Sequence, residues 1–524
     1  MEQLFAWINN ILKFVGPLSD FFWDVPTNIA AYKAIPLLGS LSLAIIVLIG
    51  SGFYFTVRLG FIQVTHMKEA IKLLAQRKHI TTGISPFAAF MLSSAMRVGP
   101  GNILGVTGAI SVGGPGAIFW MWISAFFGMA TAYVESTLAQ LFKEKKGGEF
   151  VGGLPFYGRS LIGNSAAVGV FLSAMYILYA LGCLPAQGFN VVSSLTEMYS
   201  IATGTKVATQ SGVTYFFSVA LMVFTGVVAF GGIKKVSAVT NAMVPFMAVV
   251  YVATIIVLIV INANSIPYFF SAVFAGAFKP EAIFGGFFGT ALVQGVKRGL
   301  MSNEAGQGTI TMSAAAAEDD HPCEQGLLAA AGVFLDTHII CTMTGFIVIM
   351  AHAWTADPTA WAKAGKLPKY LMSVTTLTPG TAFNDVVTFL LTLCFCLFAY
   401  TCLIGMITFP EIAANRISKS KSFINFIRWL CLAVAAFGIT VNIAGYDLGN
   451  LWAFSDLANI LIVYANIPLL YIGFKYVLKA TNNYRETNGA RFIAANVLDP
   501  EISKLCTCWT EETAAEHQQQ QQQQ

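Results

Sequence analysis

The sequence predicts an all-α polytopic membrane protein. Of its 524 residues, 56% are hydrophobic and only 11% are charged, whereas soluble domains carry about 25% charged residues. The 42 Phe and 47 Gly residues fit large apolar faces against lipid and small residues where helices approach one another. A formal net charge of +4 over the whole chain gives no basic stripe, so nucleic-acid binding is excluded.

Eleven apolar runs are each long enough for a membrane helix, which needs about 20 residues to cross the hydrocarbon core. The predicted spans are residues 35–57, 84–112, 114–141, 166–186, 213–232, 237–262, 268–296, 326–353, 383–410, 424–446 and 451–478. Lys and Arg residues are concentrated in the loops of one side, where we count Lys297 and Arg298 after the seventh span. Cytoplasmic loops retain such residues, so we expect the N-terminus outside and the C-terminus in the cytoplasm of a bacterial-type plasma (inner) membrane.

The sequence divides into an extracytoplasmic segment (1–34), a transmembrane domain (35–478) and a cytoplasmic tail (479–524). Residues 62–79 alternate apolar and basic residues at helical spacing, which predicts a helix along the inner membrane surface. Hydrophobicity falls from about Ala480 and the chain finishes in a glutamine run, which predicts a disordered tail. The start, MEQLFAW, lacks the basic region and cleavage site of a secretory signal, so we expect insertion without one.

Two spans are interrupted by helix breakers. Gly99, Pro100 and Gly101 lie near the middle of the second span, and freed backbone groups at that depth need protein or a polar cavity around them. The seventh span contains FGGFFGT at 284–290, followed by Gln294 and a polar run from Lys297. Interruptions five spans apart are typical of inverted-repeat secondary transporters with a midplane site. The repeats would be 84–262 and 268–478, with the first span as an addition.

The second-span interruption predicts a binding site. The half-helix that starts near Asn102 would present amides and a positive dipole end to a substrate carboxylate. Carbonyls released from Met96 to Gly99 can ligate Na⁺, which prefers oxygen ligands. A hydroxyl from Thr401, beside Cys402 in the ninth span, can complete the sodium shell. The alternatives are a plain proline kink and, for Thr401, a hydrogen bond back to its own helix.

Further side chains complete the predicted site. Three charged residues fall within spans, where such residues are usually paired or functional, and we interpret them as a gate or an ion pair. They are Arg97, Glu135 and Asp336. Because a guanidinium keeps its proton, Arg97 requires a neutralising partner, for which Glu135 and Asp336 are the candidates. The predicted substrate contacts are Gly99, Pro100, Gly101, Asn102, Gln187, Gly289, Thr290 and Met406.

Several long motifs resemble the alanine or glycine:cation symporter family. They are GNILGV (101–106), GGPGAIFWMWISAFFG (113–128), ESTLAQLF (135–142), RGLMSNEAGQG (298–308), HP (321–322) and GVFLDT (332–337). The resemblance implies a leucine-transporter-type fold of five plus five helices with one extra N-terminal helix. It also implies sodium-coupled import of a small neutral amino acid of the alanine or glycine type.

The chain departs from the family pattern at three places. It has Pro100 where Thr is common, Met406 where an aromatic residue is common, and Thr401-Cys402 in place of a Ser-Thr pair. Because Met is flexible and narrower than Trp, a larger neutral substrate such as glutamine is the alternative.

Other function classes have little support in the sequence. We find no G-x-S-x-G, HExxH or metal-spaced acidic run, so an enzyme is not expected. The absence of a Walker A loop disfavours ATP-driven pumping, and a channel is the remaining alternative. The nine Cys residues form no zinc framework, so no cofactor is expected. Na⁺ is the coupling ion that the broken span and the resemblance imply. The expected partners are therefore an amino acid, Na⁺ and the bilayer, and the sequence assigns no oligomeric state.

Overall fold

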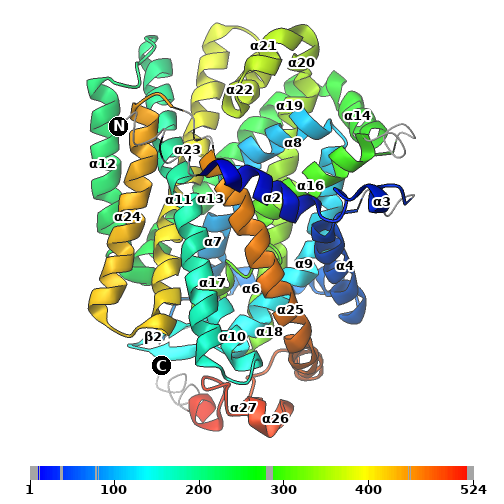
Figure 1. The fold of residues 1–524 in the computed structure, drawn as a ribbon, viewed down its shortest axis with the longest axis vertical. Helices are drawn as coiled ribbons and strands as arrows, with labels where there is room; N and C mark the ends of the chain where they lie inside the picture. Colours follow the sequence, from blue (N-terminus) through cyan, green and yellow to red (C-terminus); the bar gives the residue numbers. More distant parts are fainter. Residues whose placement is uncertain are drawn as a thin grey trace.

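The computed structural model describes residues 12–35, 41–76, 82–278, 287–446 and 450–515, together with the single positions 7, 10, 39, 80 and 448. The described regular structure is helical apart from one short hairpin (Figure 1). In chain order it begins with η1 (Leu12–Phe14), α2 (Val15–Asp24), α3 (Ala30–Lys33), α4 (Leu43–Arg58), α5 (Ile62–Thr65), α6 (Met67–Ala75), α7 (Pro86–Arg97), η3 (Gly101–Gly105), α8 (Val106–Gly113), α9 (Ala117–Leu141), β1 (Glu144–Lys146), β2 (Glu149–Val151), α10 (Leu154–Leu161), α11 (Ala166–Thr203), α12 (Gly212–Ala229) and α13 (Gly232–Ile261). It continues with η4 (Ala263–Ser265), α14 (Ile266–Phe278), α16 (Phe287–Asn303), α17 (Thr311–Ala316), α18 (Pro322–Val333), η5 (Phe334–Cys341), α19 (Thr342–Ala351), α20 (Ala353–Ala356), α21 (Pro358–Lys363), α22 (Lys366–Leu377), α23 (Thr381–Ile417), α24 (Lys421–Ile443), α25 (Asn450–Thr487), α26 (Ala494–Val497) and α27 (Pro500–Ser503).

Among the described residues, eight helical stretches are long and apolar enough to cross a membrane. They are 117–141, 166–203, 212–229, 232–261, 322–356, 381–417, 421–443 and 451–487. The other three predicted spans correspond to shorter or interrupted helices. These are α4, the series α7, η3 and α8, and the pair α14 and α16. The chain is therefore a multi-pass integral membrane protein in which the second predicted span is discontinuous, while residues 279–286 between α14 and α16 lie outside the described part of the chain.

Helices of the two predicted repeats pack against their counterparts. The second helix of each repeat forms the pair α9 and α18, the third forms α11 and α23, and the fourth forms α12 and α24. The interrupted first helices also meet, α8 against α16 and α7 against α17. Equivalent helices facing one another are what an internal repeat with a central site requires.

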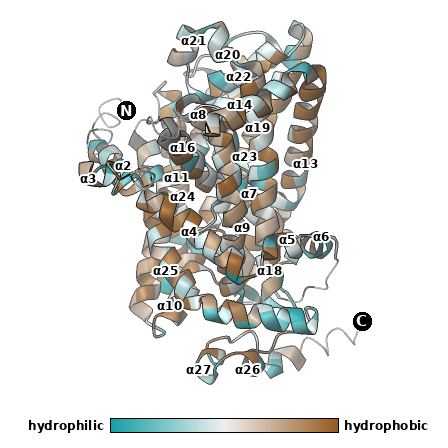
Figure 2. Cartoon of the chain, turned by 90° about the vertical axis from the view of Figure 1, so that its right-hand side faces the viewer, coloured by the Kyte–Doolittle hydropathy of each residue, from teal (hydrophilic) through white to brown (hydrophobic). Residues whose placement is uncertain are grey.

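The molecule has an apolar middle and two polar ends. Hydrophobic residues dominate helices such as α13, while hydrophilic residues gather at the end that carries α26 and α27 (Figure 2). Helices α20–α22 lie at the opposite end, and the hairpin of β1 and β2 lies near α26 and α27 (Figure 1). Of the predicted surface helix at 62–79, α5 and α6 form the described part, and α6 buries Ala70 and Leu73.

Lys297 and Arg298 do not belong to a loop as predicted. Both lie inside α16 and pair with Asp456 of α25 at 3.2 Å each. The α16 helix runs on to Asn303 because the polar residues that follow the seventh span find partners within the protein. Without these two residues, most Lys and Arg residues of the predicted loops still lie on the predicted cytoplasmic side.

The prediction of a disordered tail from Ala480 is wrong for the described residues. α25 continues to Thr487, and the segment 488–515 folds back onto the body. The indole of Trp509 is buried and donates to the Gln140 carbonyl at 2.7 Å, and the Phe492 amide donates to the Asp320 carbonyl at 2.8 Å. The terminal glutamine run lies outside the described residues.

Candidate functional site

The second predicted span is broken where the sequence indicated. α7 ends at Arg97, Val98 leaves the helical conformation, and η3 begins at Gly101 as a π-helical turn. Because Pro100 has no amide proton, it cannot continue the hydrogen-bond pattern of α7. The freed Gly99 amide donates to the side-chain oxygen of Asn102 at 2.8 Å. A helix end therefore lies inside the protein with its backbone groups partly engaged by one side chain.

The row of free amides expected after Gly101 is shorter than predicted. The Asn102 amide donates to the Gly99 carbonyl at 3.1 Å, and the amides of Ile103 and Leu104 donate to Pro100 at 3.2 and 2.8 Å. The turn closes on itself because the π-helical start brings these groups together. The Gly101 amide itself has no acceptor among the described residues.

A buried carboxylate faces the break. Asp336 lies on the π-helical turn η5 and is fully buried. Its Oδ1 accepts a hydrogen bond from the Asn102 side-chain amide at 2.6 Å. Its Oδ2 accepts hydrogen bonds from Ser302 at 2.9 Å and Thr337 at 2.8 Å. We call Asn102, Ser302, Asp336 and Thr337 the Asp336 cluster, which joins the broken span, the end of α16 and η5.

An interruption follows α16, beyond the predicted one at 284–290. Residues 284–286 of FGGFFGT lie outside the described residues, and the helix α16 runs unbroken from Phe287 to Asn303. The chain unwinds over 304–310, where Glu304, Gly306 and Gly308 all have positive φ. Such torsions favour glycine, so Gly306 and Gly308 of the RGLMSNEAGQG motif are the glycines that allow the chain to unwind here.

Two predicted substrate contacts, Gly289 and Thr290, lie away from the break at residues 99–102. Gly289 and Thr290 both fall within α16. A Cβ added at Gly113 would lie 3.2 Å from the Thr290 carbonyl, and Gly113 is the last residue of α8. This places Thr290 against the far end of α8 rather than beside Gly101, so the structure does not bring Thr290 to the predicted site. Gly289, the glycine next to it, lies within the helix and does not interrupt it.

Two further carboxylates hold the unwound stretch. Glu135 accepts hydrogen bonds from the amides of Gly306 and Gly308, the latter at 3.2 Å. Glu304 accepts hydrogen bonds from Thr309 at 2.5 Å and Tyr179 at 3.5 Å. The observed role of Glu135 is thus to bind the backbone of the second break.

Arg97 makes no direct ion pair with the predicted partners. Its Nε donates to the Asn303 carbonyl at 3.1 Å, and its two terminal nitrogens have no hydrogen-bond partner among the described residues. The predicted pairing with Glu135 or Asp336 is therefore not a contact in this conformation, because both carboxylates are engaged by neutral donors.

Thr401 does not face the break as expected. Its hydroxyl donates to the Phe398 carbonyl at 3.1 Å, within its own helix. The neighbouring Cys402 thiol faces the break instead, 3.2 Å from the Ala95 carbonyl and 3.3 Å from the Met96 carbonyl. The back-bonding alternative thus describes Thr401, and a thiol occupies the position beside the released carbonyls.

Gln187 lies on α11 and Met406 on α23, the helices that also carry Tyr179 and Cys402. Tyr179, Cys183 and Gln187 recur at four-residue intervals on α11 and share one face, and the Tyr179 hydroxyl contacts Glu304. The side-chain oxygen of Gln187 is buried without a partner among the described residues. Met406 is buried and lies one turn beyond Cys402 on α23.

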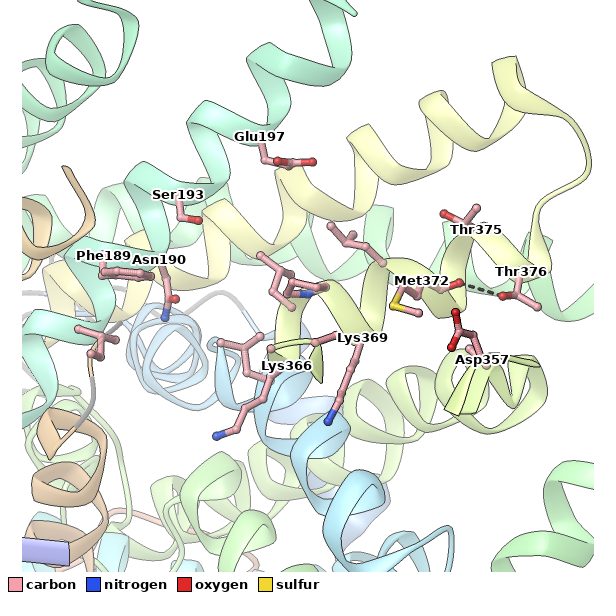
Figure 3. Close-up of a pocket in the computed structure, with 18 of the residues that line it drawn as sticks. Phe189, Asn190, Ser193, Glu197, Asp357, Lys366, Lys369, Met372, Thr375 and Thr376 are labelled. Atoms are coloured by element: carbon pink, nitrogen blue, oxygen red, sulfur yellow. Dashed lines mark hydrogen bonds between the residues drawn. The ribbon is translucent and has the colours of Figure 1, made fainter. Parts of the chain in front are cut away.

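A cavity leads towards the broken helix from the end that carries α20–α22. Its volume is about 1000 Å³, and Leu104 of η3 is one of its lining residues. Figure 3 shows its labelled walls, with Asn190 and Glu197 on one side and Lys366 and Lys369 on the other. The cavity therefore connects one surface of the protein with the turn that follows Asn102.

The opposite end is closed beneath the site. Ile84, just before α7, forms a backbone bridge with the segment after α17: its amide donates to Ala316 at 3.1 Å, and its carbonyl accepts from the Glu318 amide at 3.0 Å. The Thr82 amide donates to the Glu318 carboxylate at 2.7 Å. The structure is thus open at one end of the site and closed at the other.

Two broken helices, a buried polar site and access from one side define a secondary transporter, not an enzyme. The fold agrees with a solved structure of the same architecture, MhsT in complex with L-phenylalanine, at a TM-score of 0.57 and 12% identity, covering 82% of this chain and 96% of that chain. Residues 29–495 match the model of the sodium:alanine symporter family. The chain belongs to this family and is a sodium-coupled amino-acid symporter.

Individual relatives differ in the substrate that their names give. The sodium/alanine symporter AgcS of Methanococcus maripaludis is 39% identical over 59% of this chain and 67% of its own. The probable sodium/glutamine symporter GlnT of Bacillus subtilis is 34% identical over 84% and 87%. A further Bacillus subtilis relative, YrbD, is 38% identical over 64% of each chain.

Proposed function

We propose that the chain imports a small neutral amino acid of the alanine or glycine type together with Na⁺, by alternating access across a bacterial-type plasma membrane. In this proposal the end with α20–α22 faces outward and the end with α26 and α27 faces the cytoplasm. The observation that carries it is the Asp336 cluster, a buried carboxylate held by the broken helix. Its oxygens are the hard ligands that Na⁺ prefers.

The cation would bind at the Asp336 cluster rather than at Thr401. Carboxylate oxygens of Asp336 and hydroxyl oxygens of Ser302 and Thr337 already converge, and the Asn102 carboxamide can turn its oxygen inward. The alternative position, the carbonyls of Ala95 and Met96, faces the Cys402 sulfur. The Asp336 cluster also has a thiol beside it, Cys341, 3.1 Å from the Ser302 hydroxyl, but it offers a carboxylate charge that the alternative position lacks. Ser302 therefore enters the proposed site, although only its place in the SNEAG motif could have indicated it.

The substrate would lie beside the cation at the break from Gly99 to Asn102. The Gly101 amide, at the positive end of a helix start, is available to a carboxylate. The unpartnered oxygen of Gln187 can accept from the substrate ammonium group. The ion and the substrate would then share the Asn102 side chain, and this accounts for coupling because each stabilises the geometry that the other needs.

Uptake by purified protein in liposomes tests the proposal. Alanine uptake should require an inward Na⁺ gradient and should saturate, and Asp336→Asn should abolish the Na⁺ dependence in protein that still inserts. Uptake at wild-type sodium dependence in Asp336→Asn would overturn the cation site. Flux that does not saturate, at channel rates, would overturn the symporter.

The second candidate substrate class is a larger neutral amino acid such as glutamine. It is favoured by Met406, which is narrower than the aromatic residue common in the family, and by the similarity to GlnT. Met406→Trp should then reduce glutamine uptake far more than glycine uptake, because the larger ring fills the added space. An unchanged ranking of the two amino acids would exclude Met406 from the pocket.

A further inference from the structure

Arg97 is a buried cation without a direct counter-ion. Only 1% of its surface is exposed, and a guanidinium stays protonated inside proteins. One nitrogen donates to the Asn303 carbonyl, while both terminal nitrogens lack a partner among the described residues. A buried charge in this condition is costly unless other charges compensate for it.

The compensating charges are carboxylates that Arg97 does not touch. The strongest electrostatic attraction on it comes from Asp336, followed by Glu304 and Glu135. Each of these carboxylates accepts its hydrogen bonds from neutral groups. Close packing also fixes the guanidinium, because any side chain at Gly332 would overlap Nη1.

Arg97 is linked structurally to the Asp336 cluster. Asn303, whose carbonyl holds Arg97, directly follows Ser302 in the chain, and its side chain donates to the Thr337 hydroxyl at 3.2 Å. Arg97 is also the last residue of α7, whose start is bridged to the segment after α17 at the closed end. It therefore lies between the site and the closure.

We propose that Arg97 is a positioning residue that allows the coupling cation to be released. The guanidinium and Na⁺ are both attracted by the Asp336 carboxylate, so Arg97 weakens Na⁺ binding. After the ion has left, the positive charge of Arg97 compensates for the negative charge of Asp336. This inference rests on the proposed function, which places Na⁺ at Asp336. Like charges near one carboxylate repel each other strongly in a protein interior. Three carboxylates act electrostatically on one guanidinium, so negative charge remains for Na⁺ to bind.

The proposed role and a merely structural role predict different changes in Na⁺ affinity when Arg97 is replaced by a neutral residue. Loss of the positive charge should tighten Na⁺ binding and slow its release. The carrier that returns empty would then hold an uncompensated Asp336 charge, so net uptake should fail. Exchange of internal for external substrate, with Na⁺ on both sides, does not require the empty carrier and should persist.

The test measures Na⁺ affinity of purified Arg97→Gln by calorimetric titration with NaCl at constant ionic strength. We expect binding to be about tenfold tighter than in the wild type, with net uptake lost and exchange retained in liposomes. Arg97→Lys keeps the charge and should stay near the wild-type affinity. Arg428→Gln, which removes a guanidinium paired with Glu411 at 2.5 Å, controls for the loss of a positive charge elsewhere.

Unchanged or weaker Na⁺ binding in folded Arg97→Gln would overturn the inference, and so would equal loss of exchange and net uptake. If the Gln variant does not fold, Arg97→Met removes the same charge without requiring hydrogen-bond partners and is judged by the same criteria. Failure of the proposed function is distinguishable: there the wild type would bind no Na⁺, or Asp336→Asn would bind it normally.

Discussion

Gly101→Ala separates the binding role of the broken helix from its packing. A Cβ at Gly101 would lie 3.5 Å from the Met301 carbonyl and 3.8 Å from Ser302 Cα, which are ordinary contacts. The variant should therefore fold and melt close to the wild type. A methyl group beside the Gly101 amide would nevertheless obstruct a substrate carboxylate. A charge-assisted hydrogen bond contributes about 1.5–3 kcal/mol, so the substrate affinity should fall by about 10-fold to 150-fold.

Gly99→Ala is the matched control for Gly101→Ala. A Cβ at Gly99 would lie 2.5 Å from the Cys402 sulfur, so this variant should lose about 1–3 kcal/mol of stability through overpacking. Both variants are assayed by thermal unfolding and by alanine binding in saturating Na⁺. The amide-capped analogue of alanine should also fail to compete for the wild-type site. Normal alanine affinity in a stable Gly101→Ala would refute a carboxylate at this amide.

Three other predictions follow from particular contacts. Thr401→Val should leave the sodium concentration for half-maximal uptake within about twofold of the wild-type value, since the hydroxyl donates to the Phe398 carbonyl in its own helix. A large increase in that concentration would show that Thr401 is a sodium ligand. Trp509→Ala should lose about 3–5 kcal/mol of local packing and the hydrogen bond to Gln140, and limited proteolysis should then cleave within 488–515 while the helices stay intact. Burial lowers the pKa of Lys143 to about 8, so keeping its ammonium group charged destabilises the folded state, and this cost is relieved as the pH rises from about 8 towards the usual pKa of 10.5. The melting temperature of the wild type relative to Lys143→Met should therefore rise between these two pH values. A difference that does not change with pH would contradict this.

Local chemistry made the break at residues 99–101 predictable from the sequence, whereas the unwound stretch at 304–310 depends on long-range contacts. Gly99, Pro100 and Gly101 break a helix wherever they occur, because torsions and a missing donor are properties of the residues themselves. Glu304 adopts a positive φ that its type rarely takes, within a loop whose amides Glu135 binds from another helix. Nothing near Glu304 in the sequence encodes that partner.

The candidate site shows the same division. The residue types of Asn102 and Asp336 were recognisable as unusual in apolar spans, but their hydrogen bond joins residues 234 positions apart. Whether Thr401 or Cys402 faces the break depends on a rotation of α23 that neighbouring packing sets. Similarly, hydropathy alone cannot foresee that the Gln140 carbonyl accepts from Trp509 at the folded-back end of the chain.

The hydrogen bonds that tie the segment before α7 to the segment after α17 are of a size that ligand binding can offset. They include the two backbone bonds of Ile84 and the bond from the Thr82 amide to the Glu318 carboxylate. Neutral hydrogen bonds contribute about 0.5–1.5 kcal/mol each and charged ones about 1.5–3 kcal/mol, so these three bonds amount to roughly 2.5–6 kcal/mol. Moving a two-state equilibrium from 1:99 to 99:1 takes about 5.5 kcal/mol of differential binding. In the proposed site, Na⁺ and the amino acid meet at Asn102 and would supply this difference together, whereas either one alone would supply only part of it. Such a division is the physical requirement for coupled transport.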